Sequence, residues 1–68
     1  EFAVTDATKN LGVPLMKLKL KRDILIACIS HRGKIIIPGG SDFLSSGDTV
    51  VVVTSAGRAI IDLNDIFA

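Results

Sequence analysis

Two apolar runs separated by a short polar segment dominate the hydrophobic pattern of the chain. Residues 24–29 read ILIACI, residues 35–37 read III, and the segment SHRGK joins them. Branched side chains are stiff at χ1 and fit a pleated surface, so both runs predict strands. A connection of this length that contains Gly33 is typical of a hairpin loop. Pro38 cannot donate to a ladder, so we expect the second strand to end there or to lie at an edge of the sheet.

Two further apolar segments predict strands at either side of this hairpin. Residues 2–4 read FAV and predict a short edge strand, and Thr49–Thr54 (TVVVVT) is the strongest strand pattern of the sequence. The SSGD segment at residues 45–48 is a turn signal. The isolated apolar pair Phe43-Leu44 precedes that turn, and we expect both side chains to fill the core.

Two segments have helical spacing. Leu11, Leu15 and Leu18 recur at intervals of four and three, and Pro14 suits a first helical turn, which predicts a short helix over residues 14–18. Ser55 is a good N-cap for a last helix. The apolar stripe of that helix consists of Ile60, Ile61, Leu63, Ile66 and Phe67.

The order of these elements predicts the fold class. The elements run strand, helix, strand, strand, strand, helix, which indicates an α+β two-layer domain on a mostly antiparallel sheet of about four strands. Its strand sequences are continuous apolar runs, so both faces of the sheet are apolar. Two short helices can cover one face only. We therefore expect a second copy of the domain, or a neighbouring domain, to cover the other face, and a symmetric dimer is the commonest arrangement.

Length, charge and cysteine content narrow the class of protein. The 68 residues suffice for a single small domain, residues 1–68, and the net charge of +1 argues against general nucleic-acid binding. Cys28 is the only cysteine, so we expect no intrachain disulfide and an inert core thiol. No apolar run is long enough to span a bilayer. The start at Glu1 rather than at Met suggests a fragment of a longer protein.

Candidate chemistry is sparse, and we expect no enzymatic activity and no metal or cofactor requirement. His31, the only histidine, has no acid or nucleophile near it in sequence, and an exposed loop histidine is the favoured interpretation over a general base or a phosphate contact. Asp42 and Asp48 are either paired carboxylates or turn residues, and turn chemistry is favoured.

A basic segment lies between the first helix and the first central strand. Its cations are either an anion-binding patch or a solvated face beside an apolar stripe, and the sequence alone favours the solvated face. The four residues are Lys17, Lys19, Lys21 and Arg22.

Several motifs in fixed order resemble a known family. They are Gly12-Val13-Pro14-Leu15, Leu18-Lys19-Leu20, ILIACI followed by Arg32-Gly33, Ile37-Pro38, and Gly47-Asp48 before VVVV. Together they cover nearly the whole chain and are similar to the TrkA C-terminal (RCK_C) domain. The resemblance implies a dimeric regulatory module at the cytoplasmic side of potassium uptake systems, channels and antiporters. It also implies an RCK_N-type domain in the same protein and a membrane potassium transporter as partner.

The resemblance further implies a ligand site, because some members bind cyclic di-AMP across the dimer interface. Carried onto this sequence, apolar contacts to the adenine faces would come from Leu15, Leu25, Ile26 and Pro38. Arg22, or one of its lysine neighbours Lys19 and Lys21, would meet the phosphates.

Two other functions remain open at this point. The same residues would be only core and dimer interface if the chain were a pure dimerisation module. A domain of similar size and topology also occurs as an amino-acid-binding regulatory domain of metabolic enzymes.

Overall fold

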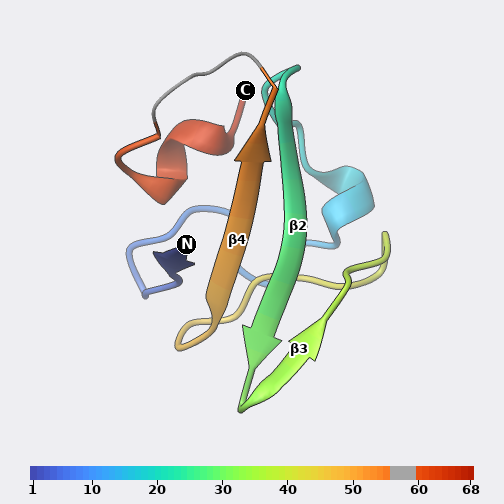
Figure 1. Ribbon diagram of the computed structural model, residues 1–68, viewed down its shortest axis with the longest axis vertical. Coiled ribbons are helices and arrows are strands. Elements are labelled where there is room, and N and C mark those ends of the chain that lie inside the picture. Colours follow the sequence, from blue (N-terminus) through green and yellow to red (C-terminus); the bar gives the residue numbers. More distant parts are fainter. Residues whose placement is uncertain (56–59) are drawn as a thin grey trace.

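A four-stranded antiparallel sheet forms the centre of the computed structural model, which describes residues 1–55 and 60–68 (Figure 1). The order across the sheet is β1-β4-β2-β3. The strands are β1 (Phe2–Ala3), β2 (Ile24–His31), β3 (Lys34–Ile36) and β4 (Thr49–Thr54). Each neighbouring pair is antiparallel, which confirms the predicted sheet and the predicted position of the N-terminal strand at an edge.

The turn between β2 and β3 is tighter than the sequence pattern suggested. β2 continues to His31 and β3 begins at Lys34, so the loop contains only Arg32 and Gly33. Both loop residues have positive φ, +49° and +81°, as the type I′ hairpin turn requires. The prediction of a loop over residues 30–34 was wrong. Ser30, His31 and Lys34 are polar and therefore look like loop residues in the sequence, but they lie at the ends of the two strands.

A bulge in β2 changes which side chains face the core. Ile26 pairs with Val52 and Cys28 pairs with Val51, so Ala27 is an extra residue without a partner in β4. Strict alternation would place Ile29 on the face opposite Ile26, but the extra residue brings both to the same face. Cys28 is consequently half-buried beside Val51, and the prediction that it is a core thiol was wrong.

The two predicted helices are single 3-10 turns. The first, η1, spans Leu15–Lys17 and follows Pro14, with hydrogen bonds from Lys17 N to Pro14 O and from Leu18 N to Leu15 O. The chain is extended again at Leu18, so the leucine spacing produced one turn instead of a longer helix. Such short 3-10 segments are frequent as connectors.

The last helix is also shorter than predicted. η2 spans Leu63–Ile66, and its N-cap is Asp62, whose carboxylate accepts a hydrogen bond from Asn64 N. The segment before it, from Ile60 to Asp62, is not helical. The predicted cap at Ser55 leads into residues 56–59, which lie outside the described part of the chain.

The core lies on the face of the sheet that the loops and 3-10 turns cover. In Figure 1 the segment that joins β3 to β4 passes behind β2, and it carries Leu44, whose side chain is fully buried. The adjacent Phe43 is half-exposed, so only one member of the predicted apolar pair fills the core. The buried hydrophobic residues are Val4, Ile24, Ile26, Ile29, Leu44, Val50, Leu63 and Ile66.

The opposite side of the sheet, called the outer face below, exposes large apolar side chains. Directly opposed residues in neighbouring strands place their side chains on one face. Leu25 pairs with Val53, and their side chains are 64% and 49% exposed; Ile35 of β3 is 78% exposed. The outer face is defined by Leu25, Cys28, Ser30, Ile35, Thr49, Val51 and Val53. No described segment of the chain covers it.

Candidate functional site

Four of the five predicted ligand residues line one pocket. Leu15 contributes from η1, Leu25 and Ile26 from the start of β2, and Pro38 from the segment after β3. The pocket has a volume of about 240 Å³ and is called the η1–β2 pocket below. Residues that lie far apart in sequence are therefore neighbours around a single hollow.

Backbone hydrogen bonds hold the two walls of this pocket together. Leu15 N donates to Asp42 O at 2.9 Å, and Met16 N donates to Gly40 O at 3.0 Å. The Asp42 carboxylate accepts from Gly39 N at 2.7 Å and closes the 39–42 turn, which confirms its predicted role as a turn residue. These bonds fix η1 against the chain that follows β3, so the pocket is preformed.

Gly40 is required for the close approach of these walls. A Cβ atom at this position would lie 3.1 Å from Met16 Cβ and 3.2 Å from Met16 Cε, which is tighter than ordinary packing allows. Sequence reasoning missed four residues of the pocket: Met16, Leu20, Gly39 and Gly40. The Gly39-Gly40 pair was a signal for close backbone contact, but only the fold reveals its partner.

Arg22 is exposed and is not among the residues that line the pocket. The neighbouring Lys19 and Lys21 use their backbones to bind the C-terminal segment: Lys21 N donates to Ile66 O, and Ala68 N donates to Lys19 O. The basic segment is thus placed beside the pocket by the Leu20–Phe67 bridge, since Leu20 itself is a lining residue.

The chemistry of the η1–β2 pocket is apolar. The eight described residues that line it provide aliphatic, thioether and backbone surface and no ionisable side chain. Such a lining suits the flat face of an uncharged ring and gives no group to a carboxylate or an ammonium. Leu25 belongs to both this pocket and the outer face, so the pocket opens where the uncovered apolar surface begins.

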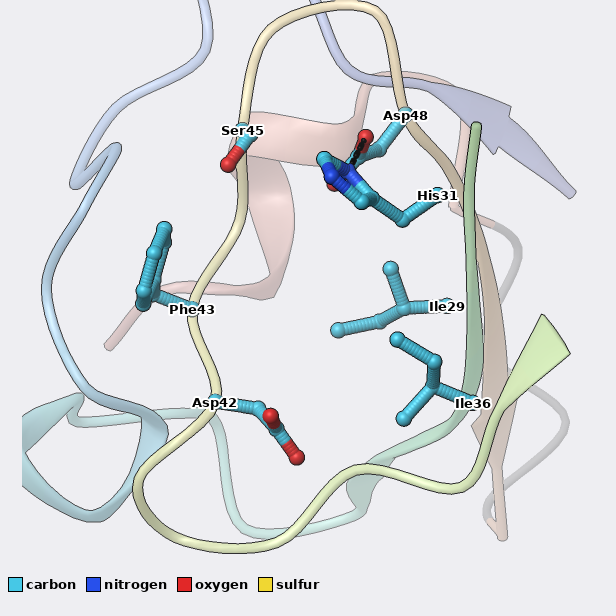
Figure 2. Close-up of a pocket in the computed structure, with 7 residues that line it drawn as sticks. All are labelled: Ile29, His31, Ile36, Asp42, Phe43, Ser45 and Asp48. Atoms are coloured by element: carbon cyan, nitrogen blue, oxygen red, sulfur yellow. Dashed lines mark hydrogen bonds and ion pairs between the residues drawn. The ribbon is translucent and has the colours of Figure 1, made fainter. Parts of the chain in front are cut away.

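A second, smaller pocket lies at the other end of the sheet. It has a volume of about 120 Å³, and Figure 2 shows His31 and Asp48 directed toward each other at its upper rim, with Phe43 and Asp42 on the facing segment. His31 Nδ1 lies 2.5 Å from Asp48 Oδ1. The Asp48 side chain is 5% exposed and the His31 side chain 41%, so a buried carboxylate has a partly exposed imidazole as its partner.

This pair corrects two interpretations of the sequence. His31 is not a free loop residue, because it is the last residue of β2 and binds Asp48, which directly precedes β4. Asp48 serves more than the turn, although its N–H does donate to Ser45 O as a turn residue would. Ser45 also lines this pocket. In the described part of the chain its hydroxyl makes no hydrogen bond with His31, so Ser45 and His31 do not form a nucleophile–base pair.

The described residues lack two features, a metal-ligating cluster and a membrane-spanning helix. They contain no group of three or more histidine, cysteine or acidic residues that would hold a metal ion. They also contain no helix that is long and apolar enough to cross a membrane.

Comparison with known proteins identifies the family. Residues 1–67 match the TrkA-C domain, and the chain belongs to this family. It is 33% identical over 67 residues to the Trk system potassium uptake protein TrkA homolog 2 of Methanosarcina mazei, covering 98% of this chain and 15% of that protein. Homolog 1 from the same organism is 31% identical, with 98% of this chain and 16% of that protein covered. The chain therefore spans less than a fifth of the length of these relatives.

Proposed function

We propose that the chain is a regulatory, ligand-sensing and dimerisation domain of a potassium uptake protein, and that it binds cyclic di-AMP at the dimer interface. The relatives that match are potassium uptake proteins of the Trk system, several times longer than this chain. In this proposal an RCK_N-type domain of the same protein passes the effect to a membrane potassium transporter at the cytoplasmic side. Ligand binding shifts the transporter between states by its different affinity for each.

The observation that carries the proposal is the meeting of Leu15, Leu25, Ile26 and Pro38 around one apolar pocket. These are four of the five residues that the family resemblance implies as ligand contacts. Three different parts of the chain supply them, so their convergence is not a consequence of their sequence spacing. An adenine ring can stack on such aliphatic surface without leaving a buried polar group unpaired.

Dimerisation through the outer face would complete this pocket. Leu25 is shared by the two surfaces, so a second copy seated on the outer face would lie at the mouth of the pocket. It would also remove the exposed side chains of Val53 and Ile35 from water. The phosphates of the ligand would then have to reach Arg22, which is exposed and can provide charge-assisted hydrogen bonds.

Calorimetric titration with cyclic di-AMP, with cyclic di-GMP, AMP and amino acids as controls, tests the ligand. We expect saturable binding of one cyclic di-AMP per dimer. Pro38→Ala and Arg22→Ala should each weaken binding by about tenfold while the thermal midpoint without ligand stays within a few degrees. The matched control is Ile61→Ala, because Ile61 is exposed and lies outside the pocket. Equal affinities of all variants would contradict the site.

A pure dimerisation module is the second candidate, and the exposed outer face supports it independently of the pocket. A dimer that binds none of the four probes would favour this function. The amino-acid-binding alternative receives less support, because the described residues that line the η1–β2 pocket offer no ionisable side chain to an amino acid's charged groups.

A further inference from the structure

A third hollow lies beside β1, at the edge of the sheet opposite β3. Neither the family resemblance nor the proposed function involves it. It has a volume of about 480 Å³ and runs between the N-terminal segment and the segment that leads into η2. Phe2 and Leu63 supply apolar surface, and Ile61, 89% exposed, adds a large aliphatic side chain. This hollow is called the β1 groove below.

The walls of the β1 groove are fixed to each other by one side chain. Asn64 Oδ1 accepts a hydrogen bond from Lys9 N at 2.8 Å, and Asn64 Nδ2 donates to Ala7 O at 3.2 Å. The N-terminal wall is also braced internally, since Thr5 N donates to Thr8 Oγ1 at 3.0 Å and Thr8 N donates to Thr5 O at 3.0 Å. A groove built in this way needs little rearrangement to accept a ligand.

The open side of β1 presents main-chain groups to the groove. Val4 N donates to Asp48 O and Gly47 N donates to Val4 O, so the polar groups of Val4 face β4. Successive residues of a strand direct these groups to opposite sides, which turns the N–H and C=O of Ala3 toward the open edge. The outward groups of Thr5 are already bonded to Thr8. Ala3 is therefore the position at which the edge can accept another strand.

We propose that the β1 groove binds an extended peptide segment of a partner protein, which adds to the sheet beside β1. The main chain of the peptide would exchange hydrogen bonds with Ala3, as in other cases of strand addition. An aliphatic side chain of the peptide would lie over Phe2 and Ile61. Among the described residues that line the groove, Asp62 has the one ionisable side chain, so a lysine or arginine in the peptide complements it.

The shape of the groove favours a single strand over a second copy of this domain. The edge lies between two walls, the 5–8 segment and the 61–64 segment. A second β1 edge would bring its own two walls into the same narrow space.

Selection of random decapeptides displayed on phage against the intact 68-residue chain provides the probe. We expect enriched sequences that combine an aliphatic residue with a basic one. Titration of such a synthetic peptide into the ¹⁵N-labelled chain should shift the amide signals of Ala3, Leu63 and Asn64. Methylation of the peptide nitrogen that pairs with Ala3 should lower affinity by about tenfold. Asp62→Asn should weaken binding about threefold, since its carboxylate is exposed.

A matched control variant keeps this test specific. Ile37→Ser changes an exposed aliphatic residue at the other edge of the sheet, and peptide affinity should be unchanged. Failure to enrich any peptide, or shifts confined to the outer face around Leu25, would overturn the proposal. If the amide signal of Ala3 shifts with protein concentration in the absence of peptide, the occupant of the groove is a second copy. That result would also overturn the proposal. Cyclic di-AMP binding does not enter any of these outcomes.

Discussion

The two faces of the sheet have similar side chains and very different surroundings. On the inner face Ile29 and Val50 are almost fully buried, whereas on the outer face Leu25 and Ile35 are mostly exposed. Both sets come from the same continuous apolar runs, so hydrophobicity does not distinguish them. The difference arises from what the rest of the chain covers: the 37–48 segment, η1 and η2 pack on one side only. An apolar run thus predicts a strand with two apolar faces, and the described chain covers only one of them.

The same substitution on each face should give the largest contrast. Leu44→Ala removes a fully buried side chain and should lower the free energy of unfolding by about 2–5 kcal/mol, enough to unfold so small a domain. Leu25→Ala on the outer face is the matched change. Urea denaturation of both variants, at a concentration where the chain is monomeric, provides the comparison. Equal losses of stability would mean that the two faces are not different.

The pair of His31 and the buried Asp48 should contribute to the free energy of unfolding. His31→Ala leaves Asp48 buried without its imidazole partner, and we expect a loss of about 1–3 kcal/mol in the free energy of unfolding. A double-mutant cycle with Asp48→Ala separates this pair from general packing. If the losses of stability in His31→Ala and Asp48→Ala add up to the loss in the double variant, the two side chains have no interaction energy. The pair then does not stabilise the contact between the end of β2 and the residue before β4.

The turn between β2 and β3 should show a smaller, purely conformational effect. Gly33 has φ +81° and open space around a Cβ position, so Gly33→Ala should cost about 1 kcal/mol from backbone strain alone. Arg32→Asn is the opposite change, because asparagine tolerates positive φ better than arginine does, and it should stabilise the hairpin by a few tenths of a kcal/mol. Thermal unfolding of the two variants measures both; stabilisation by the alanine would contradict the turn assignment.

The smallest effect on the isolated chain is expected at the outer face. Leu25→Ala should change the free energy of unfolding of the monomer by less than about 1 kcal/mol, because its side chain is already 64% exposed. The same variant should weaken self-association at least about tenfold by removing apolar contact area. Analytical ultracentrifugation over a range of concentrations measures this, and an unchanged dissociation constant would place the interface elsewhere.

The sequence identified the strands well because β-branched runs and turn residues are local signals. The edge strand, Thr49–Thr54 and the pairing of two strands in a hairpin were predicted correctly, although the hairpin loop is shorter than predicted, and the family resemblance was confirmed. The sequence overestimated both helices, since the leucine spacing at residues 11–18 is compatible with a single turn followed by extended chain. It also missed the bulge at Ala27, because pairing register depends on the partner strand.

The candidate site was predictable only through the resemblance. Nothing in the local pattern brings Pro38 near Leu15, whereas the hydrogen bonds of the 39–42 turn with η1 do so in the structure. Arg22 was predicted on the same basis and lies outside the pocket lining. The partner of His31 was hidden for a physical reason, since a contact across 17 residues leaves no periodic signal.

Light scattering of the purified chain tests most directly whether the outer face is an interface. We expect a particle with twice the mass of one chain, and a shift to the mass of one chain in a Leu25→Ser/Val53→Ser double variant that remains folded by circular dichroism. A wild-type chain that stays monomeric at the highest soluble concentration would mean that the outer face is not an interface between two copies.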